Sequence, residues 1–117
     1  MSLSEQQALD AAFDALSHPA RRAVIDRLAC GPAAAKELAD VYATGFPTLM
    51  KHVRLLENQG LICSHRVGRV RIYRLDVGRL EQIGRWIDAR CRISHRTTSP
   101  RPSLIAGRQA EWDVASA

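Results

Sequence analysis

Four histidines and three cysteines are the side chains of this sequence best suited to metal or redox chemistry. Tight metal binding needs several ligands that converge on one ion. The histidines are scattered along the chain and the cysteines lack a CxxC spacing, so we expect no metal site and no cofactor. The residues concerned are His18, His52, His65 and His95, together with Cys30, Cys63 and Cys91.

The remaining reactive residues do not form a pattern typical of catalysis. The sequence has no glycine-rich phosphate loop, no nucleophile elbow and no convincing pair of carboxylates. We interpret the acidic side chains as solvated helix faces and predict that the protein is not an enzyme. These acidic residues are Asp10, Asp14, Glu37, Asp40 and Glu57.

The centre of the chain, residues 46–62, favours the chemistry of DNA recognition. An apolar stripe of Leu49, Val53 and Leu56 predicts a helix with one buried side. The far side is short, polar and basic, which suits a helix in the major groove, although any solvated amphipathic helix has the same pattern. We interpret His52 as a residue of packing or of phosphate contact. The expected DNA contacts of this helix are Pro47, Thr48, Lys51, His52 and Arg54.

A basic hairpin is expected directly after this helix. Residues 61–66 and 70–75 are rich in β-branched and aromatic side chains and read as two strands joined by residues 67–69. Arg66, Arg69 and Arg71 lie near its tip, where guanidinium groups could follow a phosphate backbone or enter a minor groove. Charges at an exposed edge also prevent aggregation between strands, but the position after a helical pair favours phosphate contact. The pattern leaves open which face of the second strand is buried.

Helices must position these groups. Ser4 and Gln7 resemble a capping box that opens a first helix. Further helices are expected at residues 19–29, 35–42 and 78–93, with a three-residue turn at 43–45. In the helix expected at residues 19–29, Arg21, Arg22 and Arg27 are expected to be available to solvent or phosphate. Gly60 is the expected end of the helix that carries Leu49, Val53 and Leu56.

Composition limits the partners of the chain. At 117 residues it is expected to form one folded domain, residues 1–93, followed by a linker and tail, residues 94–117. The tail is expected to be disordered or to hold a short helix at 104–114. A net charge of +5 favours a polyanion such as double-stranded DNA, although a generally basic protein would share it.

Sequence features also predict the cellular compartment. No apolar run approaches the roughly 20 residues that cross a bilayer, and the N-terminus does not resemble a secretory signal. An odd number of cysteines argues against a disulfide framework, so we expect a cytoplasmic protein that does not enter a membrane.

The apolar stripes of the first and last helices predict a homodimer. In so small a protein, a terminal helix with a wide apolar surface is expected to pack against a second copy, with the first helix as its companion. The expected dimerisation residues are Leu9, Phe13, Leu80, Ile83, Trp86 and Ile87.

Four strings in order resemble the ArsR family of bacterial winged helix–turn–helix repressors: ALSHPARRAVIDRLACGP, KELAD, PTLMKHVRLLENQGLI and GRVRIYRLD. The resemblance covers about residues 13–76. It implies a mainly α fold with a small β-hairpin, dimerising through the terminal helices. It also implies repression from a palindromic operator, with residues 36–42 as positioning helix, 46–59 as recognition helix and the arginine hairpin as wing.

The sequence departs from the family pattern at several positions. Ala34 and Lys36 stand where metal-sensing members have a Cys-x-Cys pair, and the last helix lacks the paired histidine ligands of another branch. Metal sensing through either site is therefore not expected. Gly45 and Met50 replace frequent serines, so the usual contacts there do not carry over.

Two alternatives remain open from the sequence. Some family members sense oxidants through two cysteines, and Cys30 and Cys91 lie in the corresponding helices, although both could be small buried hydrophobes. Cys63 is expected to be structural. The chain could also be a winged-helix module for protein–protein contact whose DNA binding is weak or lost. No effector is indicated.

Overall fold

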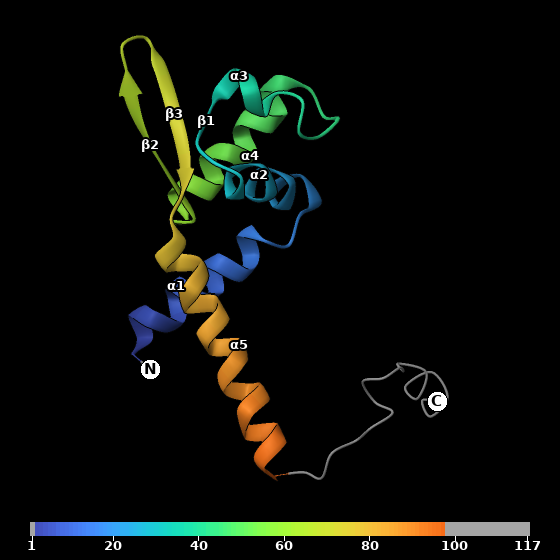
Figure 1. Cartoon of the computed structure of the whole chain (residues 1–117), viewed down its shortest axis with the longest axis vertical. Coiled ribbons are helices and arrows are strands. Elements are labelled where there is room, and N and C mark those ends of the chain that lie inside the picture. Colours follow the sequence, from blue (N-terminus) through green and yellow to red (C-terminus); the bar gives the residue numbers. More distant parts are fainter. Residues whose placement is uncertain (1, 98–117) are drawn as a thin grey trace, which may run out of the picture. The chain divides into compact units, whose positions relative to one another are not determined.

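The computed structural model describes residues 2–97. The chain divides into two compact units, one up to Gly84 and one from Arg85. Figure 1 shows the order of the elements. They are α1 (Leu3–Ala15), α2 (Pro19–Ala29), β1 (Ala33–Ala34), α3 (Ala35–Leu38), α4 (Phe46–Asn58), β2 (Ile62–Val67), β3 (Val70–Leu75) and α5 (Val77–Thr97).

Helix α1 begins earlier than the sequence pattern indicates. Its capping box is formed by Ser2 and Glu5, whose backbone and side chains bond reciprocally at 3.1 and 2.8 Å. The expected pair Ser4 and Gln7 is therefore wrong, because both residues already lie inside the helix. Helix α2 has the expected bounds, with Pro19 in its first turn, where the missing N–H has no helical partner to lose.

The third helix is shorter than expected. Helix α3 ends at Leu38 rather than at residue 42, and residues 39–45 form the connection to α4. Glu37 accepts a bond from the backbone N–H of Ala34 at 2.7 Å, which caps the first turn. Glu37 is therefore a capping residue, not only part of a solvated face.

Helix α4 is defined at both ends by glycines. Gly45 precedes it with a φ of 77°, a conformation that side chains with a Cβ rarely adopt. At its end, the N–H of Leu61 bonds to the carbonyl of Leu56 and that of Gly60 to the carbonyl of Glu57, both at 3.0 Å. This pair of bonds is a Schellman motif and confirms Gly60 as the end of the helix.

The sheet has three antiparallel strands in the order β1-β3-β2. The short strand β1 was not expected; its Ala33 and Ala34 pair with Tyr73 and Ile72 of β3. The pairing of Ser64 with Tyr73 places both on one face of the hairpin, and Tyr73 is buried. The phase that the sequence left open is thereby fixed, with Arg71, Tyr73 and Leu75 on the face that carries the buried tyrosine.

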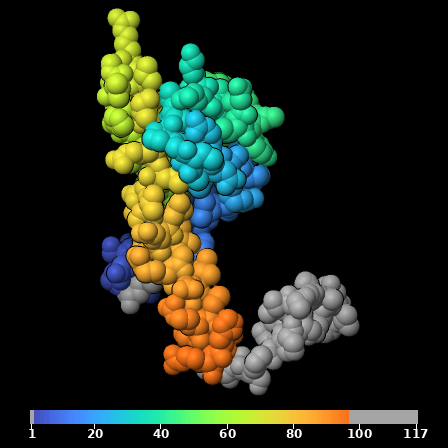
Figure 2. Space-filling model, viewed as in Figure 1, coloured from blue at the N-terminus to red at the C-terminus, as the bar shows by residue number. Residues whose placement is uncertain are grey.

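The turn of the hairpin contains two residues rather than three, because Val67 and Val70 are paired. Gly68 has a φ of 66°, whereas Arg69 does not have a positive φ. A glycine with positive φ at the first turn position is the pattern of a type II′ hairpin turn. In Figures 1 and 2 the tip of this hairpin projects beyond α2, α3 and α4.

Aliphatic side chains from the helices and the sheet form the core of the first unit. Helix α2 packs against α4 and β3, and α4 packs against β2. The largest fully buried side chains are Val24, Leu38, Leu49, Val53, Leu56, Leu61 and Ile62. This core determines which side of α4 remains exposed.

Helix α5 runs to Thr97, so the expected linker does not begin at residue 94. Within the second unit, which begins at Arg85, the guanidinium of Arg90 lies 4.2 Å from the centroid of the Trp86 ring. Nη1 of Arg92 pairs with Oδ2 of Asp88 at 2.5 Å. The expected short helix at 104–114 lies outside the described residues. Within residues 2–97, no helix is both long and apolar enough to span a membrane.

Candidate nucleic-acid interface

The outer face of α4 carries the polar residues expected to read DNA. Pro47, Thr48, Lys51 and Arg54 are exposed, whereas Leu49, Val53 and Leu56 are fully buried on the other side. The apolar side of α4 thus packs into the core and holds the helix in place. This packing leaves one hydroxyl and two cationic groups free to approach base edges and phosphates.

The fifth expected contact of this helix, His52, is half-buried and packs against α2. Its ring centroid lies 4.4 Å from that of His18, and its Nδ1 lies 3.3 Å from Nη1 of Arg21. Burial, followed by the charges of His18 and Arg21, lowers the pKa of His52. Of the two roles expected for His52, the structure provides the packing contact. A contact with phosphate remains a prediction.

The arginines of α2 are engaged with the protein rather than only with solvent. Arg21 donates to the carbonyl of Ala15 at 2.7 Å, and Arg22 donates to that of Leu16 at 2.7 Å. Arg27 donates to the carbonyl of Gly31 at 3.0 Å and lies 3.9 Å from Glu37. Their guanidinium groups thus satisfy carbonyls near helix ends, although Arg22 remains exposed. That these arginines are available to solvent or phosphate stays a prediction.

The three hairpin arginines predicted to contact DNA, Arg66, Arg69 and Arg71, are exposed, as is His65. Arg66 and Arg71 face each other across the strands, and Arg69 lies at the turn. Arg71 also donates to the Ser64 hydroxyl at 3.0 Å, and this hydroxyl donates to Glu57 of α4 at 2.5 Å. Glu57 is thus a link between α4 and the hairpin, not part of a solvated face.

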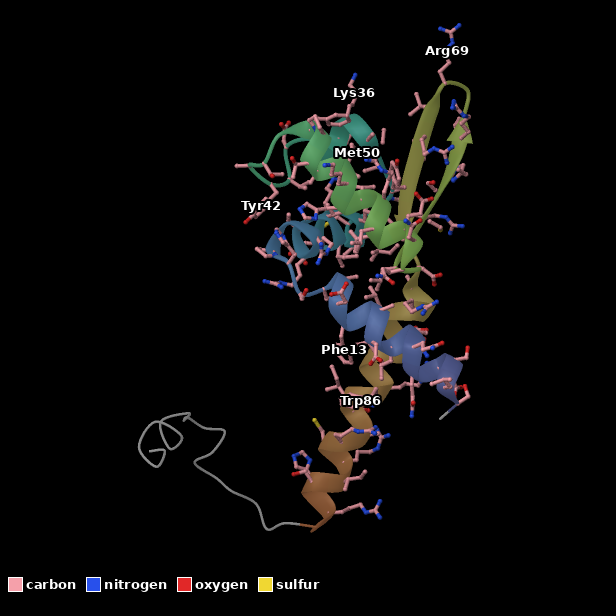
Figure 3. All side chains as sticks on the ribbon, turned by 180° about the vertical axis from the view of Figure 1, so that it is seen from behind. Phe13, Lys36, Tyr42, Met50, Arg69 and Trp86 are labelled. Atoms are coloured by element: carbon pink, nitrogen blue, oxygen red, sulfur yellow. The ribbon has the colours of Figure 1, made fainter. Side chains whose placement is uncertain are left out.

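Figure 3 adds a cation that the sequence pattern did not single out. The side chains of Lys36 at the start of α3 and of Arg69 at the hairpin turn point to the same side of the first unit. Both residues are exposed. A single lysine in a short helix carries no periodic signal, so its place beside the wing could be found only from the fold.

Two exposed aromatic side chains at the start of α4 were also not predicted from the sequence. Tyr42, in the connection before the helix, and Phe46, its first residue, are exposed. Met50, which replaces a frequent serine of the family, is half-buried. The surface around the start of α4 is therefore more apolar than the predicted contacts alone indicate.

The expected dimerisation residues differ in exposure. Leu9 and Ile83 are buried within the first unit, and Leu80 is half-buried. Phe13 is 39% exposed and Ile87 is 47% exposed. In the second unit, Trp86 is half-buried. Leu9 and Ile83 thus already contribute to the core of a single chain.

The cysteines are free thiols. Cys30 and Cys91 are exposed and Cys63 is half-buried, so neither Cys30 nor Cys91 is the small buried hydrophobe that the sequence allowed. Across residues 2–97, no three histidine, cysteine or acidic side chains gather in a way that could hold a metal ion.

Comparison with known proteins identifies this arrangement. A family model described as a helix-turn-helix domain matches residues 16–64. The HTH-type transcriptional regulator Rv2034 of Mycobacterium tuberculosis is 36% identical over 74 residues, which are 63% of this chain and 69% of that protein. The arsenical resistance operon repressor of Staphylococcus xylosus is 30% identical over 73 residues, 62% of this chain and 70% of that one.

A solved structure extends the similarity to the wing. The crystal structure of the ArsR family transcriptional regulator RHA00566 superposes with a TM-score of 0.72 at 34% identity. The match covers 80% of this chain and 96% of that one. Together with the helix pair, the exposed basic face of α4 and the arginine hairpin, it confirms the resemblance in the sequence. The chain belongs to the ArsR family of winged helix–turn–helix, DNA-binding transcriptional regulators.

Proposed function

We propose that this protein is a homodimeric repressor that binds a palindromic operator. The observation that carries the proposal is the division of α4 into a fully buried apolar side and an outer face with Thr48, Lys51 and Arg54. In this assignment α4 reads base edges in the major groove. Each good base contact contributes about 1–3 kcal/mol of discrimination against a wrong base pair.

The hairpin supplies contacts of a second kind. Arg66 and Arg69 are exposed near a tip that projects from the body, so they can reach phosphates beyond the groove that α4 occupies. Contacts with phosphate fix the position of a protein on the duplex but carry no sequence information. Affinity should therefore fall steeply with salt, whereas discrimination should depend mainly on α4.

A homodimer gives this unit a symmetric target. The 47% exposed side chain of Ile87 on α5 offers apolar surface for a second copy, as do the half-buried Leu80 and Trp86 of the same helix. Two recognition helices related by a two-fold axis read two half-sites about one helical turn apart. A relative named a repressor supports repression as the outcome of binding.

Selection from a random DNA pool, followed by fluorescence anisotropy on the selected duplex, tests the proposal. Lys51→Ala combined with Arg54→Ala should abolish the preference for this duplex over scrambled DNA. Arg85→Ala combined with Arg96→Ala removes the same charge from exposed positions of α5 and should retain the preference.

Two results would contradict the proposal. Equal affinities of wild type and the α4 variant at physiological salt would refute the recognition face. A weak response of the wild type to all DNA, with little salt dependence, would instead favour a module for protein–protein contact, for which the exposed Tyr42 and Phe46 offer apolar surface.

A further inference from the structure

Arg21 occupies the corner between α1 and α2, residues 14–21. Its Nε donates to the carbonyl of Ala15 at 2.7 Å, and its Nη2 lies 3.2 Å from the carbonyl of Asp14 and 3.5 Å from the hydroxyl of Ser17. Carbonyls in the last turn of a helix lack partners within that helix. One half-buried guanidinium thus closes the end of α1 and is held there in a fixed orientation.

The same guanidinium reaches the recognition helix. Its Nη1 lies 3.3 Å from Nδ1 of His52, whose ring packs on His18 with an angle of 39° between the ring planes. His18 is held in turn, because its Nδ1 accepts the backbone N–H of Ala20 at 3.0 Å. The corner of α1 and α2 therefore contacts α4 through a hydrogen bond and a ring contact at a single residue.

The protonation state of His52 follows from this geometry. A guanidinium has only donors, so Nδ1 of His52 must be the acceptor. We therefore assign His52 as a neutral imidazole with its proton on Nε2. The groups that face it from α2 and the corner are His18 and Arg21, and both oppose a positive charge on the ring.

His52 lies at a position where it can set the orientation of α4. It directly follows Lys51, and it precedes the buried Val53. Glu57, which bonds to the hairpin through Ser64, is five residues further and thus about 140° away around the helix axis. Bonds on these two flanks, one to the corner and one to the wing, resist rotation of α4 about its axis.

We propose that Arg21 is a positioning residue for the recognition helix, and that protonation of His52 releases α4 from the corner and weakens discrimination of the operator. A proton on Nδ1 would turn the acceptor into a donor that faces a guanidinium, so the bond cannot persist. Contacts with phosphate do not depend on this bond. The proposal rests on the assignment of α4 as the DNA reader and makes its selectivity dependent on pH.

Anisotropy on the selected duplex and on scrambled DNA, measured from pH 7.5 to 5.5, tests this device. In the wild type, the ratio of the two affinities should fall several-fold as the pH decreases. His52→Asn provides an amide oxygen that can accept from Arg21 and does not titrate, so the ratio of this variant, whatever its size, should be independent of pH. Arg21→Ala should give the low ratio at every pH. His95→Asn removes an exposed histidine on α5 and should retain the profile of the wild type.

A spectroscopic measurement separates positioning from a general effect on stability. Long-range ¹H–¹⁵N correlation spectra at pH 7.5 should show His52 as the Nε2–H tautomer in the wild type. In Arg21→Ala this preference should be lost, while the thermal midpoint reports any loss of folding separately.

Two outcomes would overturn the proposed role of Arg21 and His52. One is a ratio of affinities in His52→Asn that depends on pH as in the wild type. The other is a proton on Nδ1 of His52 at pH 7.5. A wild type that prefers its duplex equally at all pH values refutes this inference alone. A wild type without preference at pH 7.5 refutes the proposed function as well.

Discussion

The hydroxyl of Ser64 in β2 donates to Oε2 of Glu57 in the last turn of α4 at 2.5 Å. Arg71 of β3 donates to the same hydroxyl at 3.0 Å. These bonds join the helix proposed to read bases to the hairpin proposed to contact phosphates. The distance between the helix and the hairpin is thus set by side chains as well as by the short connection between them.

Ser64→Ala should loosen the hairpin relative to α4. Loss of a hydrogen bond to a charged group destabilises a protein by about 1.5–3 kcal/mol, and partial exposure of this pair favours the lower value. Affinity for the selected duplex should fall several-fold, because the wing arginines lose a fixed position. Urea unfolding and anisotropy measure the two effects. Ser4→Ala, at an exposed position inside α1, provides the control. Unchanged affinity with reduced stability would limit the bond to a structural role.

Gly68→Ala should destabilise the hairpin turn. A residue with a Cβ in this backbone region costs on the order of 1–3 kcal/mol, although the space around Gly68 is open. The strain is confined to the tip, so chemical shifts of the core should remain unchanged in NMR spectra while affinity for all DNA decreases. Gly84→Ala, inside α5 with open space around it and without a positive φ, should have no such effect. Equal affinities of the two variants would contradict a role of the hairpin in binding.

Ile87→Asp should dissociate the proposed homodimer. The substitution introduces a charge on the exposed apolar surface of α5, which a second copy would have to bury unpaired. Sedimentation equilibrium should show a dimer for wild type and a monomer for the variant, and DNA affinity should fall with it. Ile87→Leu retains the apolar surface and should remain dimeric. A wild type that is monomeric at micromolar concentration would exclude this interface.

The stability of the protein should decrease in mildly acidic solution because of His52. Its pKa is lowered in the folded state, first by burial and then by His18 and Arg21, so the unfolded chain binds the proton more readily. The contribution to stability is complete above the ordinary histidine value of about 6.5 and is lost as the pH falls through the folded pKa. Unfolding free energies measured in urea from pH 8 to 5 should show this loss. His52→Asn should reduce the slope, and an unaltered slope would assign it to other groups.

Local sequence signals predicted the elements that depend on few residues. The proline at the start of α2 and the Schellman glycine after α4 act within one turn, so both ends were correctly predicted. The buried side of α4 was equally clear, since Leu49, Val53 and Leu56 repeat at helical spacing. Helix α3 was predicted too long because Tyr42 continues the apolar spacing, although it lies exposed in the connection.

The contacts that position the site could not be predicted because they join distant residues. Arg21 and His52 lie 31 positions apart, and neither has a sequence pattern that names the other. Strand β1 contains only two alanines, whose strand conformation depends on pairing with Tyr73 and Ile72 rather than on their own propensity. Solvation was the default expectation for Glu57, and only the fold brought Ser64 to it.

The short strand β1 divides the hairpin into two parts that differ in backbone pairing. Ile72 and Tyr73 of β3 are bonded to strands on both sides, whereas Val70 and Arg71 pair only with β2. Backbone amides at the base should therefore exchange with deuterium slowly, and those of the tip faster. If the hairpin contacts DNA as proposed, we expect its arginine-bearing end to adapt to grooves of different width without disturbing the base that adjoins the core.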